Sequence, residues 1–237
     1  MSNQQHEPAV KFLVVGFDGL RPDFVTREEM PALAEFVRTS HHWTNYLACF
    51  PTETYVNHPS IFSGFRPNRH GIIANGYFNP SKKAKTPDER LFAGWSVASV
   101  MAQDRLEGGL YRVPSLGERL ARDGKRLRII CANSTGSTRL QHVHAEGCEG
   151  HLVCCVHGIH QTLPASEAKA LSQDYGDGVP LQFPDRRGTQ MTADLFLSRE
   201  VKNGVEGLAD VTVLWIGEPD HSQHEFGLRD TRTGEAR

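Results

Sequence analysis

The chain lacks an excess of positive charge. Its 26 Lys and Arg residues are balanced by 28 Asp and Glu residues, which leaves a formal net charge of -2 at pH 7. A nucleic-acid clamp needs a positive surface that releases counterions from a phosphate backbone. The composition therefore excludes a strongly basic clamp of that kind.

The chain also lacks a long apolar run and has little cysteine. No stretch approaches the roughly 20 apolar residues that a membrane-spanning helix needs, and the polar start of the sequence has no hydrophobic signal-peptide core. The five cysteines, an odd number, argue against a disulfide framework and favour a reducing compartment. These absences predict a cytoplasmic protein with no membrane span.

The composition is sufficient for one substantial core. Hydrophobic residues make up 38% of the 237 residues, and a chain of this size buries roughly 70% of its unfolded surface without disulfides. The sequence has neither internal repeats nor an obvious linker. We therefore expect a flexible N-terminal segment at residues 1–10 and part or all of a single domain over residues 11–237.

Short apolar runs alternate with helical patterns along the chain. Residues 11–16 have the pattern of a strand buried on both faces, as in a parallel sheet. Residues 127–131 form a second such run, and residues 211–216 are rich in β-branched and aromatic side chains. Strands that alternate with helices in this way predict an α/β fold with a largely parallel sheet flanked by helices.

Three segments have helical patterns, and two of them have recognisable ends. Pro31 suits the first position of a helix that runs to Arg38. Ser115 and Glu118 form a capping-box pattern for a helix that Gly124 ends. Residues 191–201 contain good helix formers with apolar side chains at helical spacing.

The segments between these elements are less regular. Residues 42–50 have an extended pattern, and Asn57 is placed to cap a helix that ends near Gly64. Residues 79–90 hold two prolines and several charges without an apolar period, which predicts a surface loop. The next regular element is expected to begin at Ser115.

Polar side chains follow several predicted strands at the edge where ligands collect in a parallel sheet. Asp18 follows the first strand, Thr54 follows the extended segment, and Asp220 with His224 follows the strand at 211–216. A carboxylate near a hydroxyl suits a divalent metal that acidifies the hydroxyl, and Asp-x-x-x-His supplies ligands that zinc accepts. Each feature alone is weak, because isolated pairs of this kind are common by chance.

The order of four motifs is far more specific than any one of them. They are Gly16-Phe17-Asp18-Gly19, Pro51-Thr52-Glu53-Thr54-Tyr55-Val56-Asn57-His58, His70-Gly71-Ile72-Ile73-Ala74-Asn75 and Glu218-Pro219-Asp220-His221-Ser222-Gln223-His224. This ordered set resembles the type I phosphodiesterase/nucleotide pyrophosphatase family of the alkaline phosphatase superfamily. The resemblance covers most of the chain. It implies an alkaline-phosphatase-like fold and hydrolysis of small phosphodiester or nucleotide substrates.

The resemblance also implies a site with two divalent metal ions, Zn²⁺ in this family. Thr54 would be the nucleophile and, with Asp18, a ligand of one ion, and Asp220 and His224 would bind the other. Asn75 and the backbone N–H of Tyr55 would hold the phosphate oxygens. The chemistry is physically consistent, because two metal ions stabilise the attacking and leaving oxygens of an in-line phosphoryl transfer through a covalent phosphothreonine.

The nucleophile loop departs from the family pattern, which has lysine before the threonine and Phe-Pro after it. This chain has Glu53, Tyr55 and Val56 instead. Tyr55 either stacks on a substrate base or packs inside the protein. Glu53 either disfavours an anionic substrate or points to solvent. The substrate and leaving group therefore stay open.

The end of the sequence departs further. In the family, one zinc needs an Asp-His pair from a later Ser-Asp-His-Gly type motif, and the other needs a later histidine. The sequence ends at Arg237, thirteen positions after His224, without either. We interpret it as an N-terminal fragment that retains little or no turnover and exposes an apolar sheet edge prone to association.

A stretch rich in cysteine and histidine lies outside these motifs. Its spacing matches no standard zinc module, so we expect loop and strand residues without metal. Its members are His142, His144, Cys148, His151, Cys154, Cys155, His157 and His160.

Two alternatives to a phosphodiesterase stay open. One is a different hydrolase of the superfamily that acts on a phosphonate or a phosphomonoester. The other is a non-catalytic binding fragment that keeps only the fold. The oligomeric state is not predicted.

Overall fold

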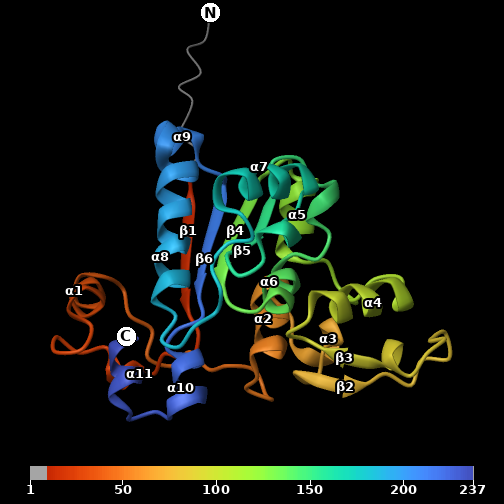
Figure 1. The fold of residues 1–237 in the computed structure, drawn as a ribbon, viewed down its shortest axis with the longest axis horizontal. Helices are drawn as coiled ribbons and strands as arrows, with labels where there is room; N and C mark the ends of the chain where they lie inside the picture. The colour runs from red at the N-terminus through yellow and green to blue at the C-terminus, as the bar shows by residue number, and fades with distance from the viewer. Residues whose placement is uncertain (1–9, 237) are drawn as a thin grey trace, which may run out of the picture.

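A computed structural model describes residues 10–236. Its centre is a four-stranded parallel sheet in the order β1-β6-β4-β5 (Figure 1). The strands are β1 (Phe12–Phe17), β4 (Leu127–Ala132), β5 (Leu152–Cys155) and β6 (Val211–Ile216). A separate antiparallel pair joins β2 (Gly76–Phe78) to β3 (Leu91–Ala93). The parallel sheet that the alternating pattern predicts is therefore present.

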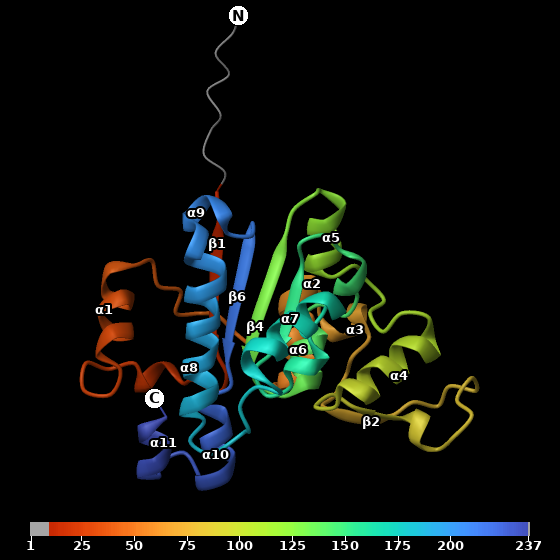
Figure 2. The same ribbon diagram turned by 45° about the horizontal axis from the view of Figure 1, so that its top comes forward.

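Helices cover both faces of the sheet (Figures 1 and 2). The helices within the described residues are α1 (Pro31–Thr39), α2 (Thr54–Ser63), α3 (Pro67–His70), α4 (Val97–Glu107), α5 (Leu116–Arg122), α6 (Thr135–Gln141), α7 (Ala165–Tyr175), α8 (Arg186–Leu195), α9 (Gly204–Gly207), α10 (Asp220–Phe226) and α11 (Thr231–Glu235), of which α1, α4, α10 and α11 lie away from the sheet. None of the helices within residues 10–236 is both long enough and apolar enough to cross a membrane.

Alternate side chains of the inner strands point to opposite faces of the sheet. Ile130 of β4 and Leu214 of β6 belong to the buried cluster that includes α7 and α8. Their neighbours Ile129 and Val213 belong to a cluster with Phe62 of α2, against which α5 also packs. The sheet is thus buried on both faces in its centre. This arrangement explains the continuous apolar runs of β4 and β6.

The β2–β3 hairpin has its own small core. Phe92 of β3 and Ile72 pack with Val100 of α4 and with Leu140 of α6, and all four side chains are buried. Because α6 follows β4 directly, this cluster fastens the hairpin to the edge of the sheet where the parallel strands end.

Several predicted ends are confirmed. α1 begins at Pro31, and α5 begins after a complete capping box in which Ser115 accepts from the Glu118 N–H and Glu118 accepts from the Ser115 N–H. Gly124 follows α5 with φ of 65°, a conformation that favours glycine. β6 has the bounds that the sequence predicts, and residues 79–90 contain no strand and only one short 3₁₀ turn.

The predicted burial of the first strand is wrong. Phe12 and Leu13 are 60% and 51% exposed, and Val14 and Val15 are also exposed. β1 lies at an edge of the described sheet and pairs with β6 alone, so part of its apolar surface meets no other element of residues 10–236. β1 thus presents an exposed apolar edge, a feature prone to association.

Other differences concern local order. Residues 42–50 form no strand, and residues 91–107 already contain β3 and α4, so order resumes well before Ser115. The helix predicted at 191–201 begins five residues earlier, because the Asp185 side chain caps α8 by accepting from the Gly188 N–H. It continues through a π turn at Phe196–Glu200. Residues 1–9 of the predicted flexible segment lie outside the described part.

Candidate active site

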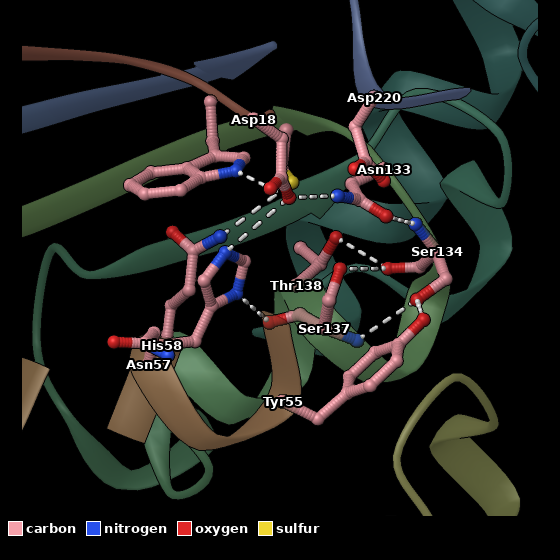
Figure 3. Close-up of polar contacts among 12 residues, drawn as sticks. Asp18, Tyr55, Asn57, His58, Asn133, Ser134, Ser137, Thr138 and Asp220 are labelled. Atoms are coloured by element: carbon pink, nitrogen blue, oxygen red, sulfur yellow. Dashed lines mark hydrogen bonds and ion pairs between the residues drawn. The ribbon is translucent and has the colours of Figure 1, made fainter. Parts of the chain in front are cut away.

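Asp18 lies at the carboxyl end of β1, where the backbone leaves the sheet. Its N–H donates to the Ile216 carbonyl of β6 at 2.9 Å. Its Oδ2 accepts from Asn133 Nδ2 at 2.7 Å and from Trp215 Nε1 at 3.3 Å (Figure 3). Burial raises the pKa of the Asp18 carboxyl above its ordinary value, although the Trp215 hydrogen bond opposes the shift. The strand end and two donors thus hold one carboxylate oxygen in a fixed direction.

Asp220 lies beside Asp18. It is the first residue of α10, and its N–H donates to the Asp18 carbonyl at 3.1 Å. Gly19 permits this approach, because a Cβ at Gly19 would come within 2.8 Å of the Asp220 Cβ. Burial and then the negative charge of Asp18 raise the pKa of the Asp220 carboxyl. The fold therefore places two carboxylates close together at one sheet edge.

His224 lies one turn after Asp220 on α10. Its Nε2 is 3.6 Å from Asp220 Oδ1, and its side chain is 82% exposed. The Asp-x-x-x-His spacing therefore brings the two side chains together on one helix face. The exposed imidazole is free to turn toward a bound cation.

Thr54 is the first residue of α2. Its hydroxyl makes no hydrogen bond to the part of the chain that the structure describes. His58 lies one helical turn later on the same face, and its Nε2 is 3.9 Å from Asp18 Oδ2. α2 therefore lies beside Asp18, and the positive end of the helix dipole favours an anion near Thr54.

The predicted cap of this helix is wrong. α2 begins at Thr54 after Glu53, so Asn57 lies inside the helix. The Asn57 side chain instead binds the preceding loop: Oδ1 accepts from the Cys49 N–H at 2.8 Å, and Nδ2 donates to the Glu53 carbonyl at 3.0 Å. Nδ2 also lies 3.3 Å from the carbonyls of Cys49 and Pro51. Asn57 thus anchors the loop that leads into Thr54.

Asn75 contacts the nucleophile loop directly. Its Oδ1 accepts from the Tyr55 N–H at 3.0 Å, and its own N–H donates to the Glu53 carboxylate. The structure thus joins the two donors that the resemblance implies, Asn75 and the Tyr55 N–H, to each other. The Glu53 side chain therefore points neither to open solvent nor toward Asp18 and Asp220, but binds the Asn75 loop to the start of α2.

Tyr55 packs inside the protein. A Cβ at Gly94 would lie 2.5 Å from the Tyr55 ring, so the absence of a side chain there makes room for it. The Tyr55 hydroxyl is 3.1 Å from Ser134 Oγ. The neighbouring Trp95 ring is edge-on to Tyr55 at 6.3 Å and is 54% exposed. Of the two aromatic rings, Trp95 is the one available to a ligand.

Asn133 and Ser134 belong to the site, but sequence reasoning missed them. They follow β4 as Asp18 follows β1, and the Ser134 N–H donates to Asn133 Oδ1 at 2.6 Å. Asn133 joins Asp18 to this turn, and Ser134 joins the turn to Tyr55 (Figure 3). Their position directly after a parallel strand, which Asp18 shares, is the sequence signal that identifies them.

Two buried ring nitrogens next to the carboxylates have no hydrogen-bond partner within residues 10–236. They are His58 Nε2 and His221 Nδ1. His58 Nδ1 is 3.2 Å from the Ser137 carbonyl, which can only accept, so the proton is on Nδ1 and the Nε2 lone pair faces Asp18. Burial lowers the pKa of His58 to about 4. Imidazole nitrogens without a hydrogen-bond partner next to carboxylates form an arrangement that suits a bound divalent cation.

Comparison with protein families gives one match that covers nearly the whole chain. The model of the family described as type I phosphodiesterase / nucleotide pyrophosphatase matches residues 12–236. A bis(5'-adenosyl)-triphosphatase of Xenopus laevis is 36% identical over 73 residues, which are 31% of this chain and 16% of that protein. Human ectonucleotide pyrophosphatase/phosphodiesterase family member 5 is 34% identical over 70 residues, 30% of this chain and 15% of that protein.

Solved structures match over a longer stretch. Murine ectonucleotide pyrophosphatase/phosphodiesterase 5, an inactive form in complex with AMP, matches 96% of this chain with a TM-score of 0.56 and 19% identity. Phosphonoacetate hydrolase from Sinorhizobium meliloti, in complex with phosphonoacetate, matches 97% with a TM-score of 0.62 and 17% identity. These matches confirm the predicted alkaline-phosphatase-like fold. The chain spans about half the length of these proteins, at 48% and 51%.

The predicted cytoplasmic location is wrong. Similar proteins are ectonucleotide pyrophosphatase/phosphodiesterases, a name that denotes enzymes acting outside the cell. The cysteine argument misled because a chain with a buried core of this size needs no disulfide in any compartment.

Proposed function

Because the chain belongs to the type I phosphodiesterase/nucleotide pyrophosphatase family, we propose that it forms part of a metal-dependent hydrolase of phosphodiester or pyrophosphate bonds. The observation that carries the proposal is the contact of Asp18 with Asp220 where β1 and β6 end, beside α2, which begins at Thr54 and whose His58 lies 3.9 Å from Asp18. A purely structural role does not require two adjacent, partly buried carboxylates at the ends of two parallel strands.

Asp18 and Thr54 would hold one divalent ion, and Asp220 and His224 would hold the other. Carboxylate, hydroxyl and imidazole donors suit Zn²⁺. When bound, the ions lower the pKa of the Thr54 hydroxyl and neutralise charge on the phosphoryl group.

The residues of the chain then account for each step. Thr54 Oγ gives up its proton to solvent and attacks phosphorus, and the leaving oxygen departs with the electron pair of the broken P–O bond. Water next attacks the phosphothreonine and restores the Thr54 hydroxyl. Tyr55 N–H, at the positive end of α2, exchanges the Asn75 oxygen for a phosphoryl oxygen, and Asn75 Nδ2 holds another.

Nucleotide-type substrates are supported by the exposed ring of Trp95. It lies beside Tyr55, the residue after the nucleophile, and presents an open aromatic face to a base. The AMP that the murine structural neighbour binds is consistent with this substrate class. Replacement of Trp95 by alanine is expected to weaken AMP binding without weakening phosphate binding.

We further propose that the site takes additional ligands from outside these 237 residues. Catalytic zinc sites use three protein ligands for each ion, whereas the four candidate residues provide two each. The chain spans about half of the solved structures that it matches. Little or no steady turnover is therefore expected, and brisk hydrolysis that Thr54→Ala abolishes would contradict this part of the proposal.

Two alternatives differ in chemistry. A phosphonate or phosphomonoester hydrolase is favoured by the match to phosphonoacetate hydrolase, whose TM-score of 0.62 exceeds the 0.56 of the ectonucleotide enzyme. A non-catalytic binding fragment is favoured by the small number of candidate ligands. The exposed ring of Trp95 beside the nucleophile loop favours a nucleotide over a small phosphonate.

The test compares two chromogenic esters in the presence of Zn²⁺. We expect release of about one p-nitrophenol per chain from bis(p-nitrophenyl) phosphate, retained in Thr54→Ser and lost in Thr54→Ala. Release undiminished in Thr54→Ala would contradict the nucleophile. A strong preference for p-nitrophenyl phosphate would favour a monoesterase. No release from either ester, with two ions bound, would favour a binding fragment.

A further inference from the structure

A second group of potential metal ligands lies at the opposite edge of the sheet. His142 follows the last residue of α6, His151 directly precedes β5, and Cys148 lies in the turn between them. Their ligand atoms all lie within 4.8 Å of one another. From this geometry we propose that His142, Cys148 and His151 bind a thiophilic divalent ion such as Zn²⁺, separate from the candidate active site.

The spacing of the two imidazoles is close to that of ligands on one ion. His142 Nε2 and His151 Nδ1 are 3.1 Å apart. Two nitrogens bound to one tetrahedral zinc at 2.0–2.1 Å lie about 3.4 Å apart, and a nitrogen and a sulfur lie about 3.5 Å apart. The two nitrogens are therefore already near the required separation, the rings would turn to face a common ion, and Cys148 Sγ would approach by roughly 1 Å.

Hydrogen bonds orient His151 as a ligand. Its Nε2 lies 2.9 Å from the Lys125 carbonyl, so Nε2 carries the proton and Nδ1 presents a lone pair to the cluster. A metal-binding histidine commonly donates its second N–H to a backbone carbonyl in this way. Without metal, the proton on His142 Nε2 fills the space between the rings. An ion would take the place of this hydrogen bond: the His142 proton would move from Nε2 to Nδ1, the Cys148 thiol would release its proton to solvent, and both rings would turn so that their lone pairs converge on the ion.

The surroundings favour a bound ion over a solvated one. His142 and His151 are 0% and 1% exposed, whereas Cys148 is only partly buried. Gly117 of α5 leaves room for the inner ring, because a Cβ there would lie 2.5 Å from the His142 ring. A hollow lined by Lys125, Cys148 and Gly150 opens beside the cluster. An ion therefore has a route in through the thiol.

The donor set distinguishes this site from the other edge of the sheet. Two imidazoles and a thiolate suit Zn²⁺ and other borderline or soft ions, and they do not suit Mg²⁺ or Ca²⁺. No sulfur ligand stands among Asp18, Thr54, Asp220 and His224. Because His-x₅-Cys-x₂-His matches no standard module, the sequence predicts no metal here, and only the folded turn brings the three side chains together.

Cobalt tests the proposal, because a thiolate bound to Co²⁺ gives a charge-transfer band in the near ultraviolet that oxygen and imidazole ligands do not give. Added to the reduced, metal-free 237-residue chain, Co²⁺ is expected to produce this band at one equivalent, and Zn²⁺ is expected to remove it. Cys148→Ser should abolish the band, and His151→Gln should weaken Co²⁺ binding at least tenfold.

Two variants serve as controls. Cys49→Ser removes another partly buried thiol, and Asp220→Asn removes a candidate ligand of the active site; both should keep the band. Because Cys148 is partly exposed, its serine variant is expected to fold, which far-ultraviolet circular dichroism checks. Absence of the band in the unmodified chain, or its survival in Cys148→Ser, would overturn the proposal.

Discussion

Truncation of Asn57 to alanine is expected to lower the free energy of unfolding by about 2–4 kcal/mol. The Asn57 amide makes two short hydrogen bonds, at 2.8 Å to the Cys49 N–H and 3.0 Å to the Glu53 carbonyl, and two longer ones at 3.3 Å. A net contribution of about 1 kcal/mol for each short bond, and less for each longer one, gives this range. The loop before Thr54 should lose its anchor.

The assay is urea unfolding followed by circular dichroism. Asn68→Ala is the matched control, because the Asn68 side chain is exposed and its loss should change the stability by less than about 0.5 kcal/mol. Asn57→Asp keeps the acceptor but loses the donors, so it should destabilise at least as much as alanine. A loss below about 1 kcal/mol in Asn57→Ala would refute the view that this amide holds the loop.

Three further predictions concern separate parts of the molecule. Burial lowers the pKa of His157, but its hydrogen bond to Asp185 and the charge of that carboxylate outweigh burial and raise it. The stability from this pair is therefore complete below the ordinary histidine pKa and is lost as pH rises through the higher pKa of the folded state. His157→Asn should remove this pH dependence from urea unfolding measured above the ordinary histidine pKa. An unchanged pH dependence would contradict the pair. Gly136→Ala should lower the stability by about 1–3 kcal/mol or more in thermal melts, because the added Cβ would overlap the backbone oxygen of Gly94. Gly234→Ala is the control, because open space surrounds that position and little stability should be lost. Equal losses in the two variants would refute the packing argument. In a Cys148→Ser background, which removes the second proposed zinc site, Asp220→Asn should weaken calorimetric zinc binding at least tenfold, and unchanged binding would remove Asp220 from the metal site.

The sequence predicts much of the central fold because local and global preferences agree there. β6 and the capping box of α5 need only their own residues to be recognised. The burial of β1 could not be predicted in the same way. An apolar run specifies a strand, whereas its exposure depends on its position at the sheet edge.

The candidate site likewise combines features that the local sequence predicts with features that depend on tertiary contacts. Asp18 and Asp220 were found because each follows a strand, and their proximity follows from the pairing of β1 with β6. Asn57 was misassigned as a cap because its side chain has two local options, a helix start or a loop, and tertiary contacts decided between them. The packing of Tyr55 depends on Gly94, which is distant in sequence and gave no local indication.

Covalent labelling of Thr54 tests the central claim most directly. The chain would be mixed with bis(p-nitrophenyl) phosphate and Zn²⁺, quenched in acid, digested and analysed by peptide mass spectrometry. Attack by Thr54 Oγ expels p-nitrophenolate and leaves a p-nitrophenylphosphoryl group on that oxygen. The account predicts this added mass on Thr54 and its absence in Asp18→Asn. An unmodified Thr54 in a sample that has released p-nitrophenol, or a label on another residue, would contradict it.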